Sequence, residues 1–155
     1  MVQQARHYAR DRPAAGHTIT LPLGLFLAEP GARGVFLPQI MPKNFVSNTA
    51  TLLLLRPRQF LANARDLVTL KAAVNEQAPR YADIRVSTVV ITGELDKTVS
   101  TNRHSRPLAA AVPDAKLIVL PDVGHMVQNA APDLVISEIE AMIGNIASST
   151  AAAAN

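Results

Sequence analysis

The sequence predicts an α/β protein with a short parallel sheet flanked by helices. Two apolar runs rich in β-branched residues, at 86–92 and 116–120, have little polar alternation, as is typical of parallel strands covered on both faces. A helical pattern follows each run, so the closing order is strand, helix, strand, helix. With 155 residues, 48% of them hydrophobic, the chain has enough apolar material for one packed domain.

The N-terminal part is patterned less regularly. Residues 1–46 are rich in proline and glycine, so we expect only short helices and turns there. The apolar stretch 19–28 is too short to span a bilayer, and the residues before it are unlike the start of a secretory signal. The pattern divides the chain into a weakly patterned segment at 1–18, an apolar helical region at 19–78, an α/β portion at 79–147 and a disordered Ser/Ala tail at 148–155.

Helices are predicted before, between and after the two strands. One begins at Pro57 and ends before Pro79, because its apolar positions repeat near the 3.6-residue period and charged residues fall between them. A second is expected over Thr101–Val112, with a kink or an interruption at Pro107. A last helix begins near Pro132.

An acid and a histidine, Asp96 and His125, follow the two predicted strands. The carboxyl ends of parallel strands meet at one edge of a sheet, so these side chains can come together although 28 residues lie between them. An imidazole that transfers protons and a carboxylate that fixes its tautomer form the acid–base pair of nucleophilic hydrolysis. We therefore take Asp96 and His125 as candidate catalytic residues.

Each candidate also has a structural interpretation. An Asp after a strand commonly caps a turn or a helix, and a Gly-His pair is a common loop sequence. Glu94 is a competing acid, but its position two residues earlier would point it elsewhere on the turn. Surface roles are favoured for the other histidines, His7, His17 and His104.

Two runs resemble the α/β-hydrolase family in the order acid before histidine. The family's acid-bearing strand and loop are similar to Val89-Val-Ile-Thr-Gly93-Glu-Leu-Asp96-Lys-Thr-Val99, and its histidine loop is similar to Val119-Leu-Pro-Asp-Val-Gly124-His125. The region 19–78 resembles the helical cap of these enzymes. The resemblance implies the C-terminal portion of an α/β-hydrolase, which hydrolyses ester-type or related bonds with a nucleophile–His–acid triad.

One part of the family pattern is missing. The family's nucleophile lies in Gly-x-Ser-x-Gly, ahead of the cap, and none of the serines in this chain lies in such a motif. The chain is therefore expected to be a truncated hydrolase that is nearly inactive alone. The unpaired edge of its short sheet predicts self-association. A non-catalytic binding module derived from the same fold is the alternative.

Composition limits the ligands. Cysteine is absent, which excludes thiol chemistry and fits a reducing, cytoplasmic compartment, and we expect no metal or other cofactor. Residues 1–85 hold eleven Lys/Arg against five Asp/Glu, but these are dispersed and Trp is absent, so nucleic acid is not expected as a partner. No glycine-rich phosphate loop supports a nucleotide-binding domain.

The parent enzyme is expected to take a small apolar substrate, and no membrane association is expected. Four large apolar residues are candidates for lining a pocket beneath the cap, although packing in the core is the favoured interpretation of each. They are Phe36, Phe45, Phe60 and Met126.

Overall fold

The computed structural model describes the backbone of residues 20–153 and the side chains of residues 21–145. The described chain forms two compact units. Unit 1 comprises residues 20–32 and 42–72, and unit 2 comprises residues 33–41 and 73–153. The segment predicted at 1–18 lies outside the described residues.

Unit 1 begins with α2 (Thr20–Phe36), whose last residues belong to unit 2. This helix has 17 residues, so the expectation of only short elements before residue 46 is wrong. Pro22 falls in the first turn, where its missing N–H has no intrahelical acceptor to lose. The leucines that follow are good helix formers, and one further proline, Pro30, is tolerated inside the helix.

The rest of unit 1 is also helical. It contains α3 (Phe45–Asn48), the 3-10 turn η1 (Thr51–Leu55) and most of α4 (Pro57–Gln77). The helix predicted from Pro57 is confirmed, and proline stands at its first position, where its fixed φ suits a helix start. Gly24 of α2 lies against Leu55, and a Cβ at this glycine would collide with the leucine side chain.

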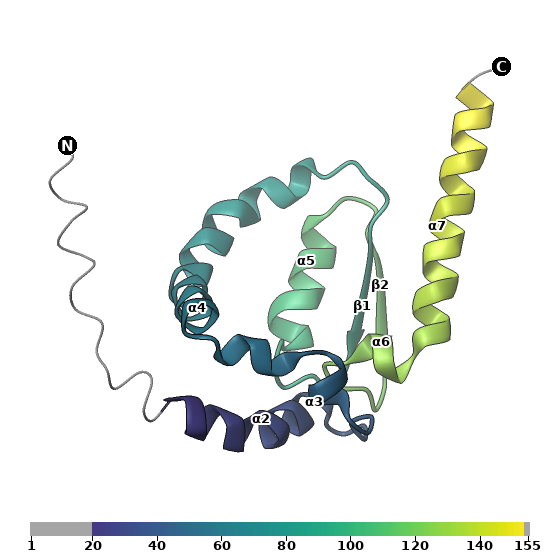
Figure 1. Cartoon of the computed structure of the whole chain (residues 1–155). Coiled ribbons are helices and arrows are strands. Elements are labelled where there is room, and N and C mark those ends of the chain that lie inside the picture. The colour runs from purple at the N-terminus through teal and green to yellow at the C-terminus, as the bar shows by residue number, and fades with distance from the viewer. Residues whose placement is uncertain (1–19, 154–155) are drawn as a thin grey trace, which may run out of the picture. The chain divides into compact units, whose positions relative to one another are not determined.

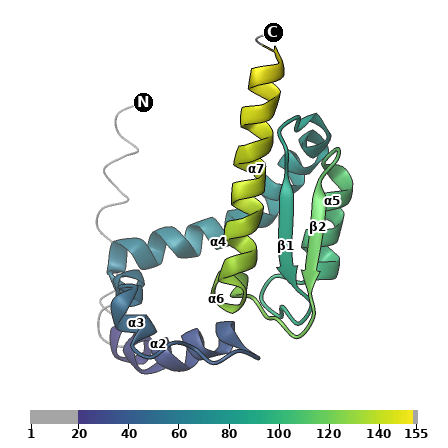
Figure 2. The same ribbon diagram turned by 90° about the vertical axis from the view of Figure 1, so that its right-hand side faces the viewer.

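Unit 2 contains both strands. After the end of α4 its elements are η2 (Ala78–Asp83), β1 (Val89–Gly93), η3 (Thr101–Ser105), α5 (Arg106–Ala111), β2 (Lys116–Leu120), α6 (Val127–Ala130) and α7 (Pro132–Ala153). The strands pair in parallel, with Val89 opposite Lys116 and Gly93 opposite Leu120. Helices α5 and α7 lie on opposite faces of this two-stranded sheet (Figure 1, Figure 2). The predicted class, a short parallel sheet flanked by helices, is confirmed.

The predicted elements of unit 2 differ from the observed ones at their ends. The second strand occupies the predicted residues 116–120, whereas the first begins at Val89, three residues later than predicted. The helix predicted over Thr101–Val112 is divided as expected: a π-helical turn ends at Ser105, and Pro107 lies in the first turn of α5.

Helix α7 continues to Ala153, through most of the segment for which the sequence predicts disorder. Alanine is the strongest helix former, and adding residues to an existing helix requires no new nucleus. Near the start of α7, Glu138 forms an ion pair with Lys116 of β2, with 2.6 Å between the Lys116 Nζ and the Glu138 Oε1. No helix in the described part of the chain is long and apolar enough to cross a membrane.

The buried centre of unit 2 is small. Phe36 is 1% exposed, and Val112 and Val127 are 2% and 9% exposed. Phe36 belongs to the segment 33–41, which groups with the strands although the sequence places it inside the region 19–78. This segment is therefore available to shape the carboxyl edge of the sheet.

Candidate active site

Asp96 lies on the loop that leaves the carboxyl end of β1, here called the acid loop (residues 94–100). Its Oδ1 accepts hydrogen bonds from the backbone N–H groups of Thr98 and Val99, both at 2.8 Å. The N–H of Asp96 donates to the carbonyl of Gly93 at 3.2 Å. Through these bonds the carboxylate of Asp96 stabilises the turn of the acid loop with Oδ1, while its Oδ2 remains available for another partner.

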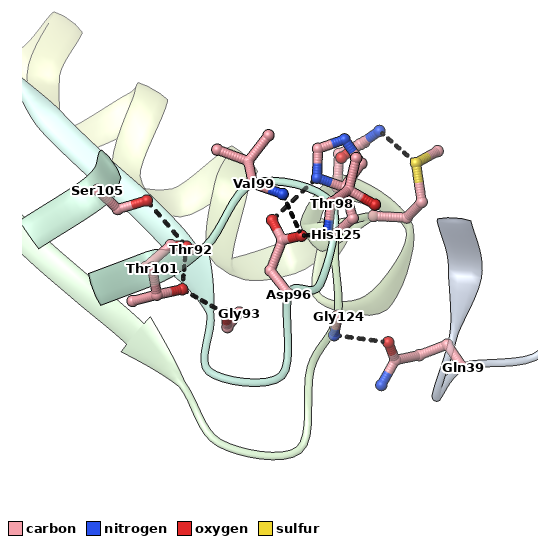
Figure 3. Close-up of polar contacts among 12 residues, drawn as sticks. Gln39, Thr92, Gly93, Asp96, Thr98, Val99, Thr101, Ser105, Gly124 and His125 are labelled. Carbon is pink, nitrogen blue, oxygen red and sulfur yellow. Dashed lines mark hydrogen bonds and ion pairs between the residues drawn. The ribbon is translucent and has the colours of Figure 1, made fainter. Parts of the chain in front are cut away.

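A chain of buried hydroxyls closes the base of the acid loop (Figure 3). Ser105 donates to the Oγ1 of Thr92 at 3.1 Å, and Thr101 donates to the carbonyl of Gly93 at 2.7 Å. Each hydroxyl carries one proton, so Thr92 must donate to Thr101 across the 2.9 Å between them. Thr92 and Thr101 are 3% and 5% exposed. These bonds hold the start of η3 against the end of β1.

His125 lies on the loop that leaves β2, here called the histidine loop (residues 121–126). Backbone hydrogen bonds join the two loops directly. The N–H of Glu94 donates to the carbonyl of Leu120, and the N–H of Leu95 donates to the carbonyl of Val123, both at 2.9 Å. The strand ladder thus continues past the ends of the strands and fixes one loop relative to the other.

Two glycines allow this close approach. A Cβ at Gly93 would overlap the carbonyl oxygens of Val123 and Gly124, and a Cβ at Gly124 would overlap the carbonyl oxygen of Leu37. Neither glycine has a positive φ, so the requirement is for space and not for an unusual backbone conformation. Both glycines stand in the runs on which the family resemblance depends.

The two predicted site residues are in contact. The Oδ2 of Asp96 and the Nδ1 of His125 are 2.9 Å apart (Figure 3). The side chain of Asp96 is 7% exposed and that of His125 is 32% exposed, so the acid is enclosed while the imidazole faces outward. An ionised carboxylate only accepts hydrogen bonds, which puts a proton on Nδ1 and leaves the lone pair of a neutral ring on Nε2.

The charge of Asp96 is stabilised locally. Burial alone would raise the pKa of Asp96, but the hydrogen bond from His125, those from the N–H groups of Val99 and Thr98, and the charge of His125 together lower it below its ordinary value. The carboxyl group is therefore ionised at neutral pH.

A pocket of about 310 Å³ opens beside His125 within unit 2. The acid loop supplies Leu95, Lys97 and Thr98 to its wall, and the segment 33–41 supplies four further residues. These are Gly34, Val35, Leu37 and Pro38. The wall is mostly apolar, with one lysine and one threonine beside the imidazole.

The competing candidates lie away from this contact. Glu94 is exposed at the turn after β1, and His104 is exposed on η3. His7 and His17 lie outside the described residues. Phe36 is packed in the core of unit 2 as favoured and does not line the pocket, whereas Phe60, in unit 1, is 43% exposed.

Two further apolar candidates are part-buried: Phe45, which belongs to unit 1, and Met126, which belongs to unit 2 and does not line the pocket. The sequence did not predict that residues of the segment 33–41 line the pocket. Nothing in a single sequence links Leu37 to a loop more than 80 residues away. Among the described residues, no group of three or more acidic or histidine side chains is placed to hold a metal ion.

The fold and this site define a class of protein. It is an α/β protein whose polar site lies outside the carboxyl ends of adjacent parallel strands, with an acid on one loop and a histidine on the next. The model of the alpha/beta hydrolase family matches residues 2–138, and the chain belongs to this family. A search of curated proteins found no match.

Proposed function

We propose that this chain supplies the acid and the histidine of a nucleophile–His–acid triad for the hydrolysis of ester-type or related bonds. The observation that carries the proposal is the 2.9 Å contact between the enclosed carboxylate of Asp96 and the Nδ1 of a partly exposed imidazole. Such a carboxylate holds the tautomer in which Nε2 accepts a proton, and it stabilises the imidazolium that forms.

In this mechanism His125 acts first as a base and then as an acid. Nε2 takes the proton of an attacking hydroxyl and later delivers it to the leaving group, while Asp96 remains ionised throughout. The pocket beside the imidazole is mostly apolar, which supports a small apolar substrate group next to the reacting bond. The chain has no cysteine and so fits a reducing compartment, and we propose the cytoplasm as its location.

The nucleophile is not part of the proposal for this chain. No serine stands in Gly-x-Ser-x-Gly anywhere in the 155 residues, and the oxyanion-hole loop that precedes such a motif has no counterpart. We propose that both groups come from sequence outside this chain. Without them the acid and the histidine can still accept and donate protons, but there is no nucleophile for the histidine to activate.

Two assays on the full chain test the proposal. We expect no turnover of a p-nitrophenyl ester above that of a His125→Ala variant, because the nucleophile is missing. We also expect diethyl pyrocarbonate to modify His125 several-fold faster than His104 at neutral pH, measured by peptide mass spectrometry. The physical reason is that Asp96 accepts from Nδ1, which leaves the Nε2 lone pair of His125 free and stabilises the positive charge that develops on the ring as Nε2 attacks the reagent.

An internal comparison makes the second assay specific. His104 is also exposed and serves as the reference in the same molecule. The ratio of the two rates should fall in Asp96→Asn, because the amide oxygen stays with the backbone N–H groups and the NH₂ group that then faces Nδ1 cannot accept from it. Equal modification of both histidines, with no effect of Asp96→Asn, would contradict the proposed role of the pair. His125-dependent ester turnover would contradict the assignment of the nucleophile to other sequence.

A second candidate function is a non-catalytic interaction module derived from the same fold. The observation that favours it is an exposed apolar stripe on α7, where Ile136, Ile139 and Ile143 are 53%, 52% and 61% exposed. Their spacing places them along one side of the helix. In the described sheet each strand also has one edge without a neighbouring strand. Exposed apolar surface and an unpaired strand edge each favour association with another chain.

We therefore expect the chain to self-associate. Light scattering should give a mass above the 16.6 kDa of one copy, and the mass should fall when Ile139 is replaced by lysine on the exposed side of α7. A matched control is Ser137→Lys, which adds the same single charge at an exposed polar position of the helix. A single species of monomer mass with cooperative unfolding would contradict self-association.

A further inference from the structure

Gln39 holds the histidine loop through both ends of its side-chain amide. Its Oε1 accepts from the backbone N–H of Gly124 at 3.0 Å (Figure 3). Its Nε2 donates to the carbonyl of Asp122 at 2.7 Å. Both partners are backbone groups on the chain just before His125. A single side chain, more than 80 residues away in sequence, thus satisfies a donor and an acceptor of the loop that carries the imidazole.

The backbone at these two positions depends on such support. Asp122 has a φ of 58°, in the left-handed region, which aspartate enters more readily than most residues but which still has an energetic cost for a residue with a side chain. Gly124 is buried, and its N–H would be left unsatisfied without an acceptor. The amide of Gln39 therefore stabilises the one conformation of the loop that directs His125 towards Asp96.

The segment that presents Gln39 is itself fixed to unit 2. Phe36, three residues earlier, is 1% exposed, and the carbonyl of Leu37 lies directly against Gly124. Leu37 and Pro38 also line the pocket beside His125. The same short segment, anchored by Phe36 at one end and by Gln39 at the other, both lines the pocket and holds the histidine loop.

We propose that Gln39 is a positioning residue for His125. It acts through the backbone of the histidine loop and sets the imidazole at hydrogen-bond distance from Asp96. Because Gln39 belongs to the segment that lines the pocket, it also holds the pocket wall next to the imidazole. This inference rests on the proposed function of the Asp96–His125 pair. It adds a residue from the region between α2 and α3 to a site otherwise built from the two strand ends.

The test measures the reactivity of His125 towards diethyl pyrocarbonate relative to His104 in the full chain. Gln39→Met keeps the length of the side chain and removes its donor and acceptor. We expect the ratio to fall most of the way to the value in Asp96→Asn, because the imidazole loses its fixed distance from the carboxylate. Gln39→Glu keeps an acceptor for Gly124 and loses the donor to Asp122, so its ratio should be intermediate.

Gln128→Met is the matched control. It removes an amide in the same unit whose hydrogen bond, at 3.8 Å, goes to the sulfur of Met126. Its ratio should equal that of the unmodified chain. Circular dichroism establishes whether each variant is folded, and Gln39→Glu decides the question if Gln39→Met unfolds.

The outcomes separate the two proposals. If the unmodified chain and Asp96→Asn have the same ratio, the proposed function fails and the role of Gln39 fails with it. If Asp96→Asn lowers the ratio while both Gln39 variants leave it unchanged, the acid–histidine pair stands and the positioning role of Gln39 is overturned. A fall in both Gln39 variants, without a change in Gln128→Met, supports the inference.

Discussion

Replacing Gly93 with alanine is expected to destabilise the chain by about 3 kcal/mol, because the new methyl group would overlap two backbone carbonyl oxygens of the histidine loop. Backbone atoms held by ladder hydrogen bonds cannot turn aside as a flexible side chain can. The bond from the N–H of Leu95 to the carbonyl of Val123, now 2.9 Å long, would have to lengthen. Urea unfolding followed by circular dichroism, at one fixed protein concentration, measures the change.

Gly144→Ala provides the control in the same unit. It lies within α7, a Cβ there meets nothing within 4 Å, and the change should stabilise the helix by roughly 0.5–1 kcal/mol. Gly124→Ala should resemble Gly93→Ala, because its methyl group would overlap the carbonyl of Leu37. The double variant Gly93→Ala/Gly124→Ala should lose less stability than the sum of the two single losses, because both changes displace the same histidine loop. Equal stability of Gly93→Ala and the unmodified chain would contradict the described packing.

The sequence was sufficient to predict the parts of the site that depend on strand order. Parallel strands end at one edge, so Asp96 and His125 had to lie near one another once both strands were identified. The residues 116–120 were recognisable as a strand because, after Lys116, β-branched and leucine side chains run without polar interruption. Periodicity identified the helix from Pro57 for a similar reason.

The segment that completes the site was not predictable in this way. Proline and glycine before residue 46 indicated turns, yet α2 runs through them for 17 residues, because tertiary context and good helix formers outweigh single unfavourable positions. Gln39 is polar and stands in no motif, and its importance arises from two backbone groups more than 80 residues later. Such a contact depends on packing, which leaves no local pattern in the sequence.

Asp96→Asn is expected to lower the free energy of unfolding at neutral pH by roughly 1.5–3 kcal/mol, the usual contribution of hydrogen bonds to a charged group. The carboxylate accepts two backbone N–H groups and the Nδ1 of His125 while it is 7% exposed. Asparagine can still accept from the backbone through Oδ1, but its NH₂ group would face Nδ1. Glu94→Gln, at an exposed position of the same loop, should change stability by less than about 0.5 kcal/mol.

The pH dependence follows from the direction of the Asp96 shift. Because the pKa of Asp96 is lower in the folded chain than its ordinary value of about 3.9, the folded state favours the carboxylate. Its stabilisation is complete above that ordinary value and is lost as the pH falls through the lower, folded pKa. The difference in urea midpoint between the unmodified chain and Asp96→Asn should therefore be constant near neutral pH and shrink in acid. A difference in urea midpoint that does not shrink as the solution is made strongly acidic would show that the carboxylate charge is not what holds the acid loop. The proposal that Asp96 fixes the tautomer of His125 would then lose its physical basis.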